Sequence, residues 1–175
     1  MNRYRIWDVF VRVFHGALAV GFLINTTVAE DAGTVHIWIG YTLAALVLGR
    51  ITWGFVGPHH ARFASFLPDR KALRDQATDI VTHRRRTRLG HSPLGALMVV
   101  NLLGTVLAIA VTGHLIPPDG GWLQNAHEAL VGWAIASVVL HIAAVMWESL
   151  RTRINLPLAM ITGRKQVPDT VDIVE

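Results

Sequence analysis

Four histidines, His15, His36, His127 and His141, lie in apolar runs that are long enough to cross a membrane. Burying an ionisable side chain at membrane depth without a partner costs several kcal/mol, so each of these residues needs an explanation. Imidazole is a common ligand of transition metals and of haem iron. Two haem groups, each held between a pair of imidazoles, would account for all four residues.

The composition predicts a membrane protein. The chain has 175 residues, of which 52% are hydrophobic and only 16% are charged, which is too apolar for a typical soluble domain of this size. It contains no cysteine, which excludes disulfides, thiolate metal sites, iron–sulfur clusters and haem attached through thioethers. The net charge of +4 could suggest nucleic acid, but basic residues in a membrane protein usually mark its cytoplasmic side.

Four segments have the length of about 20 apolar residues that a transmembrane helix needs. They cover residues 9–29, 35–56, 94–116 and 126–150. We therefore predict one domain over residues 1–175, an all-α bundle of four transmembrane helices with both termini on the same side. The connection 57–92 is longer than the others, and Leu73, Ala77, Ile80 and Val81 recur in it at helical spacing, which indicates a short helix on the membrane surface.

The distribution of basic residues predicts the orientation. The chain has 16 Lys and Arg residues, and none of them lies in the connections 30–34 and 117–125. By the positive-inside rule both termini and the connection 57–92 are cytoplasmic, and the two short connections face outward. The basic cluster at 84–88 is expected to contact anionic lipid head groups.

This orientation sets the depth of each histidine and predicts two pairs. His15 and His141 lie toward the cytoplasmic side, whereas His36 and His127 lie toward the outer side. The two histidines of the fourth helix are separated by 141 − 127 = 14 residues, which places them about 21 Å apart along the axis and within about 40° of the same direction. Both can therefore face one bundle interior.

Small residues near the pairs would allow a flat macrocycle to approach the helix backbone, although they are also common where membrane helices pack. They are Gly16, Gly40, Gly132, Ala134 and Ser137. A copper or zinc protein without haem is an alternative from a different class, but a structural zinc site normally has four ligands. At the outer pair only acidic residues could complete such a site, namely Glu30, Asp31, Asp119 and Glu128.

The remaining candidates have two interpretations each. His114 is either an interfacial, hydrogen-bonding residue or a contact for a haem propionate or a quinone carbonyl. Arg50 either extends to the cytoplasmic interface or neutralises propionates of the inner haem. His91 is expected to serve the start of the third helix, and the histidines of the long connection, His59, His60 and His83, are expected to be solvated.

The chain resembles the bacterial cytochrome b561 family, which includes the b-type cytochrome subunits of nickel–iron hydrogenases. The resembling stretches are Arg5-Ile-Trp-Asp8 with Arg12-Val-Phe-His15, His36-Ile-Trp-Ile-Gly40, Trp53-Gly-Phe-Val-Gly57 with His60-Ala-Arg-Phe-Ala64, Gly90-His-Ser-Pro-Leu-Gly-Ala-Leu-Met98, His127-Glu128 and Met160-Ile-Thr-Gly-Arg-Lys165. The resemblance implies four core helices and two haem b groups, with iron bound by His15, His36, His127 and His141. It also implies electron transfer between quinone and a partner or substrate at one surface.

From these observations we expect a multi-pass protein of the bacterial inner membrane that transfers electrons, with a periplasmic cytochrome c, a dehydrogenase or a hydrogenase as protein partner and quinone as membrane partner. No catalytic residue is expected. A stand-alone oxidoreductase that acts on a small diffusible species and quinone is the alternative within this class, and a structural adaptor without cofactor is a third possibility. A homodimer stays open, and no nucleic acid is expected.

Overall fold

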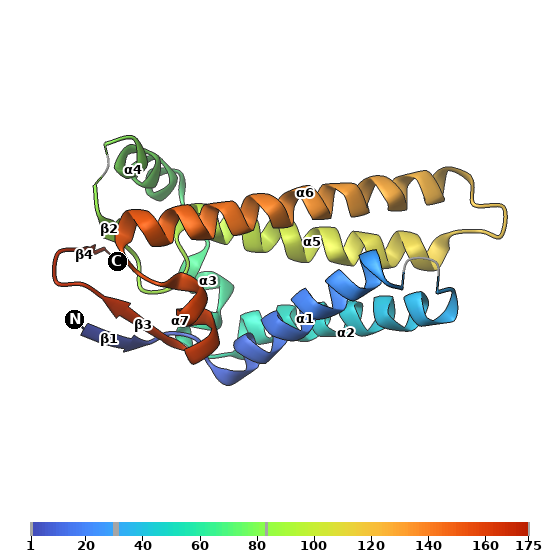
Figure 1. Cartoon of the computed structure of the whole chain (residues 1–175), viewed down its shortest axis with the longest axis horizontal. Helices are drawn as coiled ribbons and strands as arrows, with labels where there is room; N and C mark the ends of the chain where they lie inside the picture. The colour runs from blue at the N-terminus through green and yellow to red at the C-terminus, as the bar shows by residue number, and fades with distance from the viewer. Residues whose placement is uncertain (1, 30–31, 83, 175) are drawn as a thin grey trace.

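A computed structural model of the chain describes residues 2–29, 32–82 and 84–174. Four helices are long and apolar enough to cross a membrane: α1 (Val9–Thr27), α2 (Thr34–Val56), α5 (Pro93–Leu115) and α6 (Gly121–Thr152). α1 and α2 form one antiparallel hairpin and α5 and α6 form a second, and the two hairpins lie side by side (Figure 1). The predicted all-α membrane fold with four spanning helices is confirmed.

Capping residues explain where the helices begin. The Asp8 side chain accepts a hydrogen bond from the Val11 amide at 2.9 Å and starts α1. Ser92 does the same for α5, where Pro93 takes the first helical position. α6 begins earlier than predicted, because Gly120 and Gly121, with φ of 75° and 58°, turn the chain so sharply that the helix starts at once.

The spanning helices pack in the order α1, α2, α5, α6. A buried cluster of Phe14, Leu43, Val47, Leu103 and Val106 joins the first three of these helices. α6 contributes no residue to this cluster and packs along α5. Among the described residues, α1 and α6 are not packed closely along each other, so the bundle is held together mainly through α2 and α5.

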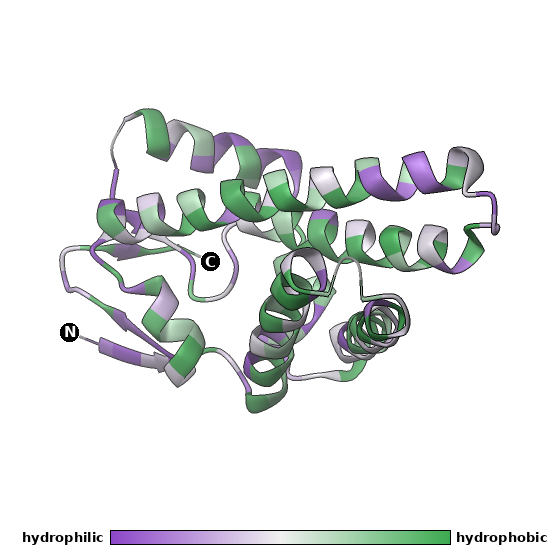
Figure 2. Ribbon diagram, turned by 45° about the vertical axis from the view of Figure 1, so that its right-hand side comes forward, coloured by the Kyte–Doolittle hydropathy of each residue, from purple (hydrophilic) through white to green (hydrophobic). Residues whose placement is uncertain are grey.

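The exposed sides of the four spanning helices are apolar, as a lipid-facing surface must be. Large hydrophobic side chains are exposed on each spanning helix, for example Val20 at 59%, Leu48 at 52%, Val111 at 51% and Leu140 at 61%. Figure 2 shows apolar colours along these helices and hydrophilic colours on the strands near the N-terminus. This contrast supports the assignment of the four helices to the membrane.

The end of the bundle that carries both termini, called here the terminal end, is covered by short elements (Figure 1). They are η1 (His59–Ala61), α3 (Phe63–Phe66), α4 (Arg70–Val81), α7 (Leu156–Thr162) and the strands β1 (Asn2–Arg5), β2 (Arg86–Thr87), β3 (Arg164–Val167) and β4 (Asp172–Ile173). β1 pairs antiparallel with β3, and β2 pairs parallel with β4. The strands, which the sequence did not predict, tie the two chain ends and the long connection into one cap.

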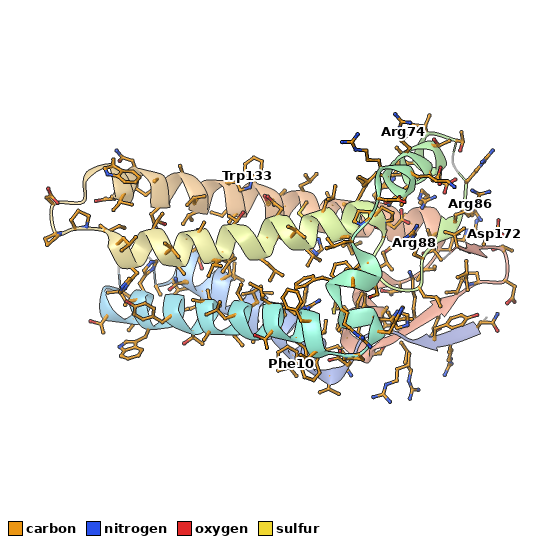
Figure 3. All side chains as sticks on the ribbon, turned by 180° about the vertical axis from the view of Figure 1, so that it is seen from behind. Phe10, Arg74, Arg86, Arg88, Trp133 and Asp172 are labelled. Carbon is orange, nitrogen blue, oxygen red and sulfur yellow. The ribbon has the colours of Figure 1, made fainter. Side chains whose placement is uncertain are left out.

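α4 is the helix predicted in the long connection, and Asp69 caps it by accepting from the Ala72 amide at 2.7 Å. Ala72 and Asp79 are buried, and Asp79 forms an ion pair with Arg86 of β2 at 3.8 Å. Figure 3 shows the side chains of Arg74, Arg86, Arg88 and Asp172 at this end of the molecule. Lipid contact by α4 and by the basic cluster remains a prediction.

Candidate haem-binding site

The structure brings His15 of α1 and His141 of α6 together toward the terminal end. Their ring centroids are 6.5 Å apart and their planes are inclined by 52°. The two residues belong to different hairpins and are far apart in the sequence, so only the bundle places them opposite each other. This is one of the two pairs that depth and helical spacing predicted.

A second pair lies toward the opposite end of the bundle, where His36 of α2 faces His127 of α6. Their ring centroids are 6.3 Å apart and their planes are inclined by 67°. The Nδ1 atom of His36 is buried and has no hydrogen-bond partner in the part of the chain that the structure describes. α6 thus supplies one member of each pair, and α1 and α2 supply one partner each.

The separation within each pair fits an iron atom bound on both sides. A metal–imidazole bond is about 2.0–2.1 Å long, and a ring nitrogen lies about 1.1 Å from the centre of a five-membered ring with bonds near 1.35 Å. Two such ligands on one metal therefore have ring centroids about 6.3 Å apart, against the observed 6.5 and 6.3 Å. Ring pairs without a metal also occur at centroid distances of about 4.5–7 Å. The observed distances therefore show that a haem iron fits between the two rings of each pair.

Small residues leave the backbone open beside each pair. A Cβ atom added at Gly16, next to His15, or at Gly40, one turn from His36, would meet nothing within 4 Å. The same holds for Gly132. Ala134 and Ser137, in contrast, are buried, and Ser137 contacts α5, where Asn101 donates to its hydroxyl at 3.0 Å.

α5 carries no member of either pair, but it holds His127 in place. The Nδ1 atom of His127 lies 3.1 Å from the Ile109 carbonyl oxygen, which can only accept a hydrogen bond. The hydrogen is therefore on Nδ1, and the Nε2 lone pair is available for a metal. A Cβ atom at Gly113 would lie 3.0 Å from Cε1 of this ring, so only glycine gives the ring its present place.

These supports escaped the sequence-based prediction. Ile109 and Gly113 are spaced by four residues and so lie on one face of α5, but the register of α5 against α6 decides whether that face meets His127. A glycine in the last turn of an apolar helix was the available signal. It could not be distinguished from the small residues that serve helix packing.

His114 forms a hydrogen bond with a neighbouring helix. Its Nδ1 atom lies 2.8 Å from the Tyr41 hydroxyl of α2, and both side chains are exposed on the isolated chain. The hydrogen-bonding interpretation of His114 is confirmed. A contact of His114 with a propionate or a quinone remains a prediction.

Arg50 does not extend to solvent, contrary to one of its two interpretations. Its side chain is only 2% exposed, because the long connection covers it. One terminal nitrogen donates to the Ala61 carbonyl at 3.1 Å, and the guanidinium lies 5.3 Å from the centre of the Phe63 ring. The other terminal nitrogen has no partner among the described residues, so the role of propionate partner remains a prediction.

His91 is packed inside the terminal end, and Ser92 instead caps α5. Its ring centroid lies 4.6 Å from that of Trp7 and 4.3 Å from that of Phe66. Burial is the main cause that lowers the pKa of His91 to about 3, and the positive charge of Arg50 adds to it, followed by smaller effects of Lys165, His141 and His60. His91 is therefore a neutral packing residue at neutral pH.

The histidines of the long connection have separate environments. His59 is exposed, as predicted. His60 is half-buried, and burial lowers its pKa, with a smaller effect from the neighbouring His59. His83, like Glu30 and Asp31, lies outside the described residues. Within those residues no group of three or more His, Cys, Asp or Glu side chains could hold a metal ion, so each pair offers two imidazoles.

A bundle of four membrane helices that holds an imidazole pair near each end has the architecture of a membrane cytochrome of the b type. The comparison with known families agrees with this class. The chain belongs to the prokaryotic cytochrome b561 family, whose model matches residues 6–163. It is therefore a membrane protein that binds haem b and takes part in electron transfer.

Several curated relatives share the name "Probable Ni/Fe-hydrogenase B-type cytochrome subunit". The relative from Bradyrhizobium diazoefficiens is 27% identical over 94% of this chain and 86% of its own length. The one from Azotobacter vinelandii is 34% identical over 57% of this chain and 45% of its own length. The one from Cupriavidus necator is 23% identical over 94% of this chain and 87% of its own length. No solved structure matches the chain.

Proposed function

We propose that the chain carries electrons across a bacterial inner membrane between two haem b groups, one held by His15 and His141 and the other by His36 and His127. The observation that carries the proposal is the repeated imidazole separation, 6.5 and 6.3 Å, toward opposite ends of one bundle. The bound haem supplies one-electron exchange between ferrous and ferric iron. The four imidazoles would hold the two haems with two protein ligands to each iron, which would favour electron transfer over oxygen binding.

The chain's own residues space and orient the two groups. His127 and His141 are 14 residues apart on one straight helix, which corresponds to about 21 Å along the axis. The Ile109 carbonyl fixes the ring of His127, and the apolar helices exclude water around both pairs. The pairs thus form two stations at different depths of the membrane.

The basic residues support an orientation with the terminal end in the cytoplasm. The connections between α1 and α2 and between α5 and α6 contain no Lys or Arg, whereas all 16 basic residues lie elsewhere. The His15–His141 pair is then the inner site and the His36–His127 pair the outer site. The names of the relatives support a hydrogenase as protein partner, which we place at the outer surface, next to the outer site. A periplasmic cytochrome or a dehydrogenase would fit the same surface, and quinone is the proposed partner within the membrane.

A second candidate is an oxidoreductase that works with a small diffusible species and quinone without a protein partner. It is favoured by the size of the outer connection between α5 and α6, where the chain passes from Leu115 to Gly121. Such a short connection offers little surface for docking. Co-purification of a second subunit with the tagged protein would exclude this candidate.

The test compares His36→Ala and His141→Ala with the wild type. Haem quantitation and reduced-minus-oxidised spectra of the purified protein should show two low-spin haems in the wild type and one unperturbed haem in each variant. His59→Ala is the matched control, because this exposed histidine belongs to neither pair and should leave both haems unchanged. Two normal haems in both test variants would contradict the ligand assignment.

A further inference from the structure

A cavity of about 280 Å³ lies beside His15, between α1 and α7. Apolar side chains form most of its wall, and Arg12 is the one charged residue among the described residues that line it. The other lining residues are Val9, Val13, Gly16, Met160 and Ile161. An apolar wall, an imidazole and a guanidinium suit a flat apolar group with a metal at its centre and an anion at its edge.

We propose that Arg12 binds a propionate of the inner haem. The inference rests on the proposed binding of that haem between His15 and His141. Arg12 precedes His15 by three residues, so the two side chains are neighbours on one helix surface, with Arg12 about 4.5 Å closer to the terminal end. Because a carboxylate at membrane depth is costly, the propionate edge must face the nearest aqueous side, which is the side of Arg12.

The surroundings of Arg12 leave part of its guanidinium without a partner. One terminal nitrogen donates to the Ile161 carbonyl of α7. The Nε atom is buried and has no hydrogen-bond partner within the described ranges. An arginine in such a place retains donors that match a carboxylate.

Gly163 lies close to Arg12. A Cβ atom at this position would first meet the Trp7 carbonyl oxygen, at 2.7 Å, and would also lie 3.3 Å from Cδ of Arg12 and 3.4 Å from one of its terminal nitrogens. The end of α7 therefore holds the arginine stem against the cavity in a fixed place. Arg50, in contrast, is covered by Ala61 and Phe63 and does not line this cavity.

The test measures the midpoint potential of each haem in Arg12→Gln, Arg12→Lys and Arg50→Gln, with haem content as a second measurement. Loss of a positive charge beside a propionate favours ferric iron, so Arg12→Gln should lower the potential of the inner haem. We expect a tenfold change in the ferrous-to-ferric equilibrium, which is about 59 mV for one electron. Arg12→Lys should restore most of the potential, and the outer haem should not change.

The matched control is Arg5→Gln, which removes one exposed positive charge from the same end of the protein. An unchanged inner potential in Arg12→Gln, or a shift no larger than that of Arg5→Gln, would overturn the inference. The inference would also be overturned if the potential of the inner haem were lowered in Arg50→Gln but not in Arg12→Gln. Loss of the inner haem from Arg12→Gln but not from Arg12→Lys would support it, whereas loss from both would indicate a packing role and overturn it. A wild-type protein without the inner haem would instead refute the proposed function.

Discussion

Gly113→Ala tests whether α5 positions a haem ligand without supplying one. Gly113 lies in the last part of α5, and its missing side chain leaves room for the ring of His127. The substitution adds a single methyl group and removes no polar group. Its effect on haem binding can therefore be attributed to the position of that ring.

The size of the displacement follows from the contact distances. The new Cβ atom would lie 3.0 Å from Cε1 and 3.2 Å from Nδ1 of His127, whereas carbon atoms in contact prefer about 3.5–4.0 Å. The ring must recede by about 0.5 Å, which stretches the hydrogen bond of 3.1 Å to the Ile109 carbonyl beyond its useful range. Loss of such a supporting contact typically weakens metal binding about 10-fold to 100-fold. Alanine also favours the helix by about 1 kcal/mol over glycine, so the fold itself should not weaken.

The assay combines haem quantitation, spin-state spectroscopy and thermal unfolding of the purified protein. Gly113→Ala should weaken the binding of haem by the His36–His127 pair, or convert part of this haem to the high-spin form. The unfolding temperature should be unchanged or higher. Gly104→Ala is the matched control on the same helix. It is 113 − 104 = 9 residues away, which places it on the opposite face of α5, and its Cβ atom would meet nothing within 4 Å. Equal haem content and spin state in the two variants would refute the reasoning.

Two further predictions concern pH and the terminal end. The folded pKa of His91 is about 3 against an ordinary 6.5, so the unfolded chain takes up the proton first as the pH falls, and stability should decline from pH 6.5 toward pH 3. His91→Phe keeps a flat ring between Trp7 and Phe66. In thermal unfolding, this variant should lose up to about 4 kcal/mol less stability than the wild type over this pH range. An equally steep loss of stability in the variant would contradict the prediction. Burial lowers the pKa of Lys165 to about 8 from 10.5, against a raising effect of Glu148, so stability should rise by up to about 3 kcal/mol between pH 8 and 10.5. The same measurement on Lys165→Met should show no such rise, and parallel curves for the two proteins would argue against it.

The features that the sequence predicted best are those with a long, regular signal. Four apolar runs of membrane length produced four spanning helices, because the length of an apolar run is enough to identify a span. The spacing of His127 and His141 on one helix, together with the direction of each span, was enough to predict which histidines meet. The structure brings these two residues opposite His36 and His15.

The features that the sequence could not predict depend on contacts between distant short segments. β1 pairs with β3, so that Asn2 lies opposite Val167 and Arg5 lies opposite Arg164. Each strand has only four residues, and buried and exposed residues alternate in only one of them, so the local sequence does not predict these strands. The burial of Lys165 follows from the same pairing, which places its ammonium 3.0 Å from the Thr87 hydroxyl. Such positions are decided by the closed cap and not by the residues next to them in the sequence.

α5 carries none of the four paired histidines, but its packing against α6 affects the position of both His127 and His141. Asn101 of α5 donates to Ser137 at 3.0 Å and accepts from Trp133 of α6 at 3.1 Å, at a level between His127 and His141. In an apolar environment these polar groups have no water to replace a lost partner, so they favour one register of the two helices. A shift by one turn would move both histidines by about 5.4 Å relative to their partners, which is far more than a metal bond tolerates. The register of α5 on α6 therefore sets the geometry of both candidate sites at once.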